Sequence, residues 1–322
     1  MNGRTEVPST SSLPQADAAR PLWSVMIPTY NPRADYLEQS LSSVLAQDLG
    51  PARMQIQVVD DCSTRVDVAS AVKSIAGERV AFSKNVTNLG LAGCWNSCIE
   101  RSRGMWVHIL HQDDYICPGF YERFEEVAHR HPNVSLIAAR SFVIDEGGII
   151  TGVTSRLRNL EAGGRSVDDF FYCTPILCPG VVVCREFYER YGGFRSDLTF
   201  TLDCEMWARV IGSCGGVVIP DVLAAYRSSS SNATARLEST GEAIVDIARK
   251  NQLFQDRYAT FDRTIAERNI SRLAMQNADK FSKTGDRDAA SANLSYWKTN
   301  TKAVRRLRYF IGKLIRKAIE QL

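Results

Sequence analysis

Two adjacent aspartates follow an apolar segment of the sequence, and their chemistry suits the binding of a cation. Residues 109–114 read Ile-Leu-His-Gln-Asp-Asp, so the segment ends at Asp113 and Asp114. Neighbouring carboxylates repel each other and lose solvation on burial, so packing alone gives no reason for the pair. Mg²⁺ and Mn²⁺ remove that cost, since they bind carboxylate oxygens and leave positions for phosphate groups. The alternative is a surface turn, because Asp is frequent in turns that end strands.

Two earlier apolar segments also end in polar residues. Residues 54–59 run into Asp60 and Asp61, and residues 22–27 run into Pro-Thr-Tyr-Asn at 28–31. Helical patterns separate the segments, and this alternation predicts an α/β fold with a mainly parallel sheet flanked by helices. Ligands bind beyond the carboxyl ends of the strands in such sheets. We therefore expect the three polar clusters to lie near one another and to form a ligand site.

The remaining pattern predicts further elements around these strands. The predicted helices of the first half are Asp35–Gln47, Val66–Ala76, Leu91–Arg101 and Gly119–Arg130, and its further strands are Val80–Phe82, Met105–Leu110 and Val134–Ala138. Beyond Arg140 the pattern predicts a hairpin of Ser141–Asp145 and Ile149–Val153, a loop at 154–164, a strand at Val181–Cys184, a helix at Leu202–Ile211 and an extended segment at Val217–Tyr226. From Thr240 onward nearly all of the chain is predicted to be helical.

Composition indicates a soluble globular protein with a reduced interior. The chain has 322 residues, 44% of them hydrophobic and 23% charged, and its net charge of +3 gives no argument for a nucleic-acid partner. Its nine cysteines are odd in number and lack a paired C-x-x-C spacing, which favours reduced thiols in a cytoplasmic protein. We expect a disordered leader at 1–20, an α/β domain at 21–235 and a helical C-terminal extension at 236–322.

Seven motifs, taken in order, resemble those of the inverting family 2 glycosyltransferases, which have the GT-A fold, a Rossmann-like sheet flanked by helices. The motifs are Val-Met-Ile-Pro-Thr-Tyr-Asn at 25–31, Val-Val-Asp-Asp-Cys-Ser-Thr at 58–64, Asn-Leu-Gly at 88–90 with Asn96 and Gly104 beyond it, His-Gln-Asp-Asp at 111–114, Tyr-Gly-Gly-Phe at 191–194, Asp203 through Trp207 to Arg209, and Tyr-Arg at 226–227. Each motif is weak alone, and their order and spacing carry the resemblance, which covers about residues 22–227.

The resemblance implies a binding site for a nucleotide-diphosphate sugar. Asp61 is expected to contact the base, since carboxylates accept well from imide N–H groups and ribose hydroxyls. Asp60 lies beside it, and Thr29, Tyr30 and Asn31 line the same pocket. For Tyr30 the alternatives are stacking or hydrogen bonding to the ligand, or a place at the edge of the core.

The resemblance also implies a divalent metal, Mn²⁺ or Mg²⁺, at the diphosphate. Asp113 is expected to reach the ribose and to share the metal with Asp114, which binds the cation that bridges the phosphates. Asn88 and Gly90 contact the nucleotide in this interpretation, although Asn-x-Gly is also ordinary turn chemistry. Asn96 is expected to be a buried cap or core amide.

The expected general base is Asp203. An inverting transfer needs a base that deprotonates the acceptor hydroxyl, and a carboxylate that is ionised at pH 7 meets that need. The alternative is an N-cap aspartate, with Glu205 and Arg209 as solvated charges of the same helix. Trp207 is expected to be a core residue rather than a platform for the acceptor sugar.

Three positions depart from the family pattern. His111 stands where the family usually has an acidic residue, and it either contributes a nitrogen to the metal or fills space at the edge of the core. Leu202 replaces an acidic residue that is common just before the base. Ser228–Ser231 follow Tyr-Arg where many relatives carry a histidine near the metal.

Residues 302–322 predict a basic amphipathic helix. Seven Lys or Arg residues lie mostly opposite an apolar stripe, a pattern typical of helices that bind an anionic membrane surface. We therefore expect a peripheral position on the inner face of the plasma membrane and a saccharide or lipid-linked acceptor. The alternative is a helix packed on the catalytic domain or on a second subunit of a homo-oligomer.

Two other functions fit the sheet architecture less well. A sugar-nucleotide nucleotidyltransferase has a Gly-rich basic loop after its first strand, where this chain has Pro-Thr-Tyr-Asn. A non-catalytic protein that binds nucleotide sugars is the other alternative, motivated by the departures near the metal.

Overall fold

The computed structural model describes residues 20–230 and 232–300. The predictions for 1–19 and for the basic helix at 302–322 lie outside these residues. The chain divides into two compact units between Ser229 and Ser230, and each unit is described by itself. Within the described residues, no helix is both long enough and apolar enough to cross a membrane.

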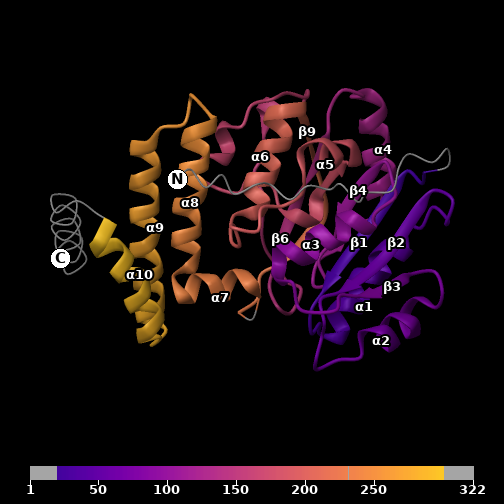
Figure 1. Ribbon diagram of the computed structural model, residues 1–322, viewed down its shortest axis with the longest axis horizontal. Helices are drawn as coiled ribbons and strands as arrows, with labels where there is room; N and C mark the ends of the chain where they lie inside the picture. Colours follow the sequence, from indigo (N-terminus) through magenta and orange to yellow (C-terminus); the bar gives the residue numbers. More distant parts are fainter. Residues whose placement is uncertain (1–19, 231, 301–322) are drawn as a thin grey trace. The chain divides into compact units, whose positions relative to one another are not determined.

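A sheet of nine strands forms the centre of the first unit. Figure 1 shows its strands β1, β2 and β3 together with helices α1 and α2. Its order is β3-β2-β1-β4-β8-β6-β9-β5, and β7 pairs with β6. The strands are β1 (Trp23–Thr29), β2 (Met54–Asp60), β3 (Ala81–Lys84), β4 (Trp106–Ile109), β5 (Tyr115–Ile116), β6 (Leu136–Ile144), β7 (Ile150–Val153), β8 (Val181–Cys184) and β9 (Gly216–Arg227).

Six α-helices and three short 3₁₀ turns accompany the sheet among the described residues of this unit. The helices are α1 (Ala34–Leu45), α2 (Val68–Ala76), α3 (Gly90–Arg101), α4 (Phe120–Arg130), α5 (Arg185–Tyr191) and α6 (Leu202–Cys214). The 3₁₀ turns are Arg158–Leu160, Asp168–Phe170 and Cys178–Gly180. Leu37 of α1, Val72 of α2 and Phe124 of α4 join the core that lies on the sheet.

The central strands are nearly all apolar because they are buried on both faces. Every residue of β1 is buried, which explains why its sequence does not alternate between polar and apolar residues. β1 pairs in parallel with β2 and with β4, and its register sets Thr29 opposite Asp60 and Met26 opposite Ile109. The carboxyl ends of the three strands therefore meet at one edge of the sheet.

The structure confirms the predicted α/β class and most element positions, and it differs in three respects. The sheet is mixed beyond β4, since β8 runs antiparallel to both β4 and β6. The segments predicted as two strands on either side of Arg140 form the single strand β6, and the guanidinium of Arg140 bonds the carbonyls of Thr154 and Pro220 beside a register shift. Helix α5 was not predicted, because it has only seven residues.

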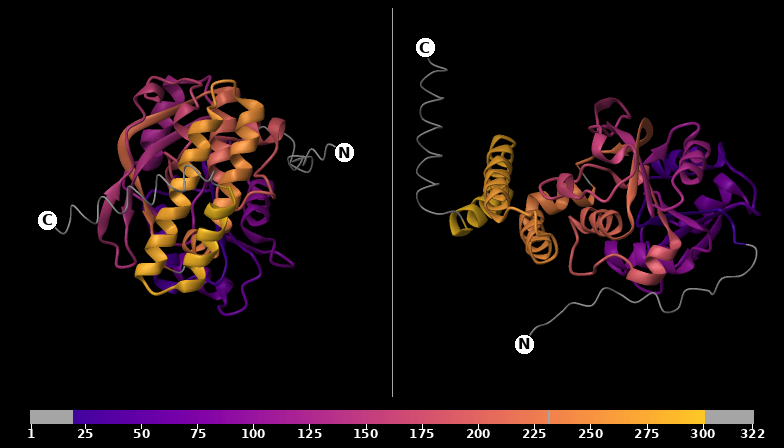
Figure 2. Two further views of the ribbon diagram at one scale, coloured as in Figure 1. Left: turned by 90° about the vertical axis from the view of Figure 1, so that its left-hand side faces the viewer. Right: turned by 90° about the horizontal axis from the view of Figure 1, so that it is seen from above.

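Four helices make up the described part of the second unit. They are α7 (Ala233–Thr240), α8 (Glu242–Arg257), α9 (Arg263–Lys283) and α10 (Arg287–Asn300). Figure 2 shows α8, α9 and α10 side by side. Ile244, Met275 and Trp297 belong to their shared core, and Asn232 and Asp262 cap the N-termini of α7 and α9. The helical character predicted from Thr240 onward is confirmed for the described residues.

Candidate active site

The loop after β4 buries an aspartate with one unpartnered oxygen. Asp114 is 1% exposed, and its Oδ1 accepts a 2.8 Å hydrogen bond from the backbone N–H of Arg227. Its Oδ2 has no hydrogen-bond partner among the described residues, and His111 Nδ1 lies 3.2 Å from it. A buried carboxylate oxygen without a partner is costly, so this oxygen is suited to a ligand that carries positive charge.

The electrostatics of this loop also suit a cation. Burial and the neighbouring charge of Asp114 raise the pKa of Asp113 to about 6, because both oppose a second negative charge. His111, Asp113 and Asp114 each offer one ligand atom, and these atoms lie within 4.8 Å of one another. The three side chains therefore fit a divalent cation, which would offset the repulsion between the carboxylates.

Arg227 fixes the loop from the far end of β9. Its guanidinium donates to the carbonyl of Asp113 over 3.0 Å and lies 4.2 Å from the ring centroid of Tyr36 in α1. Its backbone N–H is the donor to Asp114. The motif Tyr-Arg at 226–227 is thus a structural support of the carboxylate pair, a role that its sequence does not reveal.

The loops after β1 and β2 are joined through side chains. Asn31 has a left-handed backbone with φ 46°, and its Oδ1 accepts hydrogen bonds from the N–H groups of Thr64 and Arg65. Its own N–H donates to Ser63 Oγ, and that hydroxyl donates to the buried Asp60. Asn31 and Asp60 are brought together as predicted, and both support the loops from inside.

Asp61 holds the start of α3. Its carboxylate accepts from Asn85 Nδ2 at 2.9 Å and from the N–H groups of Leu89 and Gly90. Asn88 Nδ2 also donates to the carbonyl of Asp61. Asn88 and Gly90 therefore form the turn that the sequence permitted. The Leu89 N–H also reaches the second oxygen, so three donors make four hydrogen bonds with the buried Asp61 carboxylate.

Tyr30 lies where the loops after β1 and β4 meet. Gln112 accepts from the N–H of Tyr30 at 2.8 Å, while the Tyr30 side chain is 47% exposed and free to cover a planar ligand. Thr29 is only 2% exposed, and its hydroxyl is directed to the carbonyl of Val59. Sequence reasoning gave no role to Gln112, although it belongs to the motif at 111–114.

Asp203 lies in the first turn of α6. Thr201 occupies the N-cap position, so the alternative interpretation of Asp203 as the N-cap is wrong. The same alternative made Glu205 and Arg209 solvated charges, and this is also wrong, since these side chains are 6% and 3% exposed and pair over 2.9 Å. Arg209 further donates to the carbonyls of Tyr191 and Gly193 and ties α6 to the Gly-Gly-Phe turn.

A line of stacked rings connects α6 to the loop after β4. His111 stacks on Trp95 with centroids 4.8 Å apart, Trp95 meets the edge of Phe194, and Phe194 meets the edge of Trp207. Trp207 is 2% exposed and is a core residue, as predicted. Asn96 supports the line, because its amide makes two hydrogen bonds with the backbone of Phe194.

Cys178 lies within electrostatic reach of both the carboxylate loop and α6. Burial raises the pKa of its thiol, His111 lowers it, and the charges of Asp203 and Asp114 raise it further. The side chain of Asp203 is half-buried, and its Oδ1 accepts from the N–H of Cys204. The predicted base and the predicted metal ligand Asp114 therefore both act on the Cys178 thiol.

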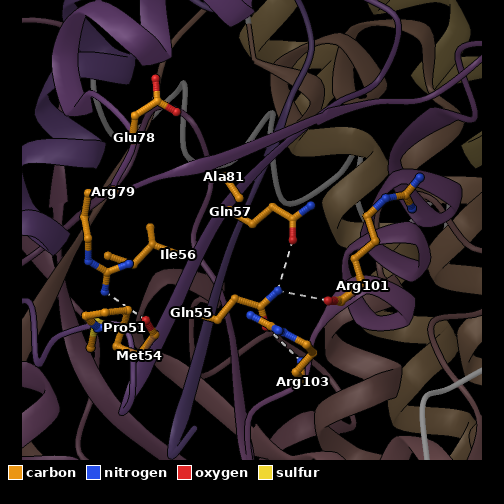
Figure 3. A pocket seen from close by; sticks show the side chains of 10 residues that line it. All are labelled: Pro51, Met54, Gln55, Ile56, Gln57, Glu78, Arg79, Ala81, Arg101 and Arg103. Atoms are coloured by element: carbon orange, nitrogen blue, oxygen red, sulfur yellow. Dashed lines mark hydrogen bonds between the residues drawn. The ribbon is translucent and has the colours of Figure 1, made fainter. Parts of the chain in front are cut away.

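A separate surface cavity lies at the other end of β2. It measures about 390 Å³ and is lined by side chains that include Gln55, Gln57, Arg79, Arg101 and Arg103 (Figure 3). Hydrogen bonds link Gln55 to Gln57 and to the carbonyl of Arg101. None of the predicted site residues lines this cavity.

Comparison with known proteins agrees with this fold. The family model described as glycosyl transferase family 2 matches residues 24–186, half of the chain, and the chain belongs to that family. It is therefore a glycosyltransferase. The uncharacterized protein MT1568 of Mycobacterium tuberculosis is 28% identical over 256 residues, which are 73% of this chain and 76% of that protein.

Two solved structures share the GT-A-like fold. TarS 1–349 of S. aureus, in complex with UDP-GlcNAc, aligns with a TM-score of 0.55 and 16% identity over 86% of this chain and 92% of that one. The mannosyltransferase PcManGT of Pyrobaculum calidifontis, in complex with GDP-Man and Mn²⁺, aligns with a TM-score of 0.56 and 18% identity over 96% and 82% of the two chains. At this identity the likeness shows the fold.

Proposed function

We propose that the protein is a metal-dependent inverting glycosyltransferase that moves a sugar from a UDP-sugar to a hydroxyl group of a saccharide or lipid-linked acceptor. The observation that carries the proposal is the set of carboxylates at the ends of the two strands that flank β1, Asp60 and Asp61 at the end of β2 and Asp113 and Asp114 after β4. Asp203 in the first turn of α6 adds a further carboxylate, whose charge acts on Cys178 as that of Asp114 does. Strand-end carboxylates and a separate carboxylate on a helix are the two parts that such a transfer needs.

The donor site is assigned to the three strand ends. Asp61 accepts from the base, with Asp60, Thr29 and Asn31 holding the surrounding loops, and the exposed ring of Tyr30 covers the base or ribose. These loops are already cross-linked through Asn31 and Gln112, so little ordering remains for the ligand to induce. Asn88 and Gly90 support the pocket as the turn that Asp61 binds.

The diphosphate site is assigned to the loop after β4. Asp113 binds the ribose, and Asp114, together with Asp113, holds Mn²⁺ or Mg²⁺. A cation bound there would neutralise charge on the leaving diphosphate. TarS with UDP-GlcNAc supports the donor class, and PcManGT with Mn²⁺ supports the cation.

Asp203 is assigned as the general base. Asp203 lies in the first turn of α6 rather than at its N-cap, and its Oδ1 accepts from the N–H of Cys204. The helix itself is held rigidly by the buried pair of Glu205 and Arg209. A carboxylate on a rigid support accepts the proton of the acceptor hydroxyl while that oxygen attacks the sugar.

A thermal-shift titration tests the donor and metal assignments. UDP-, GDP- and dTDP-sugars with and without Mn²⁺ are compared on the wild type and on Asp114→Asn, which keeps an acceptor for the Arg227 N–H. We expect UDP and Mn²⁺ together to raise the melting temperature of the wild type and to leave that of the variant unchanged. Equal stabilisation of both proteins contradicts the metal assignment.

Replacing the base tests the mechanism. Asp203→Asn is expected to keep the fold and donor binding, and to slow transfer about 10²-fold or more, the usual scale for losing a positioned general base. Ser213→Ala, near the end of the same helix, is the matched control and should retain activity. Transfer by Asp203→Asn within threefold of the wild type rules out the base role.

We further propose that the enzyme acts in cell-surface polysaccharide or glycolipid synthesis at the cytoplasmic face of the plasma membrane. The basic amphipathic pattern of residues 302–322, which lie outside the described residues, supports this location. Co-sedimentation with anionic liposomes at low and high salt tests it, and failure of the full chain to sediment at low salt removes the membrane proposal.

A further inference from the structure

The imidazole of His111 lies beside the carboxylate pair, and packing alone does not explain its position. Its Nδ1 lies 3.2 Å from Asp114 Oδ2, yet Oδ2 has no hydrogen-bond partner among the described residues. The two atoms are within the distance of an ion pair. His111 Nε2 is likewise buried without a hydrogen-bond partner among those residues. A buried nitrogen and a buried oxygen without such bonds are costly unless another group completes the site.

The separation of the two atoms matches that of neighbouring ligands on one cation. With metal–ligand bonds of about 2.1 Å, adjacent ligands of an octahedral ion lie about 3.0 Å apart. The stacking of His111 on Trp95, with centroids 4.8 Å apart and planes inclined by 27°, holds the ring in this position. Trp95 in turn packs against Phe194. The nitrogen is thus positioned before any cation arrives.

We propose that His111 supplies a nitrogen ligand through Nδ1 and makes the site select Mn²⁺ and similar transition-metal ions over Mg²⁺. Mg²⁺ takes oxygen ligands in near-ideal octahedral geometry, whereas imidazole nitrogen suits transition metals. A site made only of oxygen ligands binds Mn²⁺ and Mg²⁺ alike. A site with two carboxylates and one imidazole therefore prefers Mn²⁺. The inference rests on the proposed metal site, and its test reads metal binding without turnover.

Binding of Mn²⁺ to the full chain, with UDP present and absent, is followed by the loss of the free-ion electron paramagnetic resonance signal, with Mg²⁺ as competitor. His111→Phe keeps a ring that can stack on Trp95 but removes both nitrogens, and His111→Asn places an oxygen near the position of Nδ1. His129→Asn on the exposed surface of α4 is the matched control.

We expect the wild type and the control to bind Mn²⁺ more tightly than Mg²⁺ by about tenfold or more. Loss of one residue that supports a metal changes the metal affinity by about this factor. Both His111 variants should lose most of that preference. Pulsed spectra of the bound Mn²⁺ should show coupling to a ¹⁴N nucleus in the wild type and none in His111→Asn. Circular dichroism melts confirm that each variant is folded, and His111→Asn keeps the test valid if His111→Phe does not fold.

The possible failures are distinguishable. If the wild type binds Mn²⁺ and Mg²⁺ equally, or if the ¹⁴N coupling persists in His111→Asn, the role of His111 is overturned while the metal site stands. If the wild type binds neither ion, with UDP or without it, the metal site of the proposed function is overturned as well.

Discussion

At the scale of single residues, two left-handed backbone positions in neighbouring loops have opposite side-chain roles. Cys62 has φ 63° and follows Asp61, while Asn31 has φ 46° and follows Tyr30. The side chain of Cys62 makes a long contact of 3.8 Å with the carbonyl of Val86. Asn31 instead accepts two backbone hydrogen bonds that join its loop to the next one.

We predict that glycine has opposite effects at these two positions. A left-handed backbone conformation costs a residue other than glycine about 1 kcal/mol or more of folding free energy. Replacement by glycine removes this cost, but part of the benefit is lost because glycine makes the unfolded chain more flexible. Cys62→Gly should therefore leave the free energy of unfolding unchanged or raise it by up to about 1 kcal/mol. Asn31→Gly should lower it by about 1–2 kcal/mol, because two hydrogen bonds are lost. Urea denaturation measures both, and destabilisation of Cys62→Gly as large as that of Asn31→Gly contradicts the argument.

Residue types show which side chains suit a binding site. They do not show which distant parts of the chain those side chains also bond. Asp61 was predicted as a ligand contact, but its bonds to Leu89 and Gly90 are long-range contacts that no local pattern records. Gln112 and Ser63, which cross-link the loops, were missed for the same reason. Charged residues on a helix are usually solvated, and for this reason the buried pair of Glu205 and Arg209 was also missed.

At the scale of elements, the close approach of α3 to the Gly-Gly-Phe turn determines where α6 lies. A Cβ added at Gly193 would collide with Asn96 Oδ1. The backbone of Phe194 bonds both ends of the Asn96 amide, and Arg209 of α6 donates to the carbonyl of Gly193. Glycine is therefore needed at 193 because a side chain would not fit against Asn96, and not because of backbone flexibility.

We predict that Gly193→Ala destabilises the protein by about 1–3 kcal/mol, the usual range for overpacking a filled site. It should slow transfer as well, since α6 carries the proposed base. Gly147→Ala in an exposed turn is the matched control, because a Cβ there meets only Asp145 Oδ1 at 3.4 Å. The double variant with Asn96→Ala should recover part of the lost stability. Chemical denaturation and transfer assays check this, and a fully stable Gly193→Ala would show that the turn adjusts freely.

The order of strands and helices was predictable from sequence because it follows from local hydrophobic periodicity. The end of β2 at Asp60 and the end of β4 just before the loop with Asp114 were located for this reason. The antiparallel position of β8 between β4 and β6 was not predictable, since it depends on pairing with strands far away in the chain. Arg140 interrupted the apolar pattern of β6 and made one strand resemble two.

At the scale of the whole molecule, a buried histidine makes stability depend on pH. His108 in β4 contacts the hydroxyl of Tyr121 and the carbonyl of Pro179, and it stacks on Phe120. Burial lowers the pKa of His108 from its ordinary value of 6.5 to about 4. Between these two values the unfolded chain binds a proton that the folded protein excludes, so stability falls as the pH falls through this range.

We predict a loss of about 2 kcal/mol in the free energy of unfolding between pH 8 and pH 5 that is specific to this histidine. Above pH 6.5 its contribution should be constant. His108→Gln removes the titration and keeps polar atoms for both partners, so its stability should change less over the same range. The exposed His129→Gln is the control. Urea melts at several pH values measure the difference, and parallel pH profiles for wild type and His108→Gln would contradict the prediction.

The bond between Asp114 and Arg227 has a consequence for the synthesis of the chain. These residues are 113 positions apart, so Asp114 leaves the ribosome long before Arg227, whose backbone N–H donates to its carboxylate. At about 5–20 residues per second, the interval is roughly 6–23 s. During this time the carboxylate pair stays hydrated at an unfinished sheet, because β9 has not yet been made. The nascent chain thus completes its proposed cation site only when the last strand of the first unit is in place.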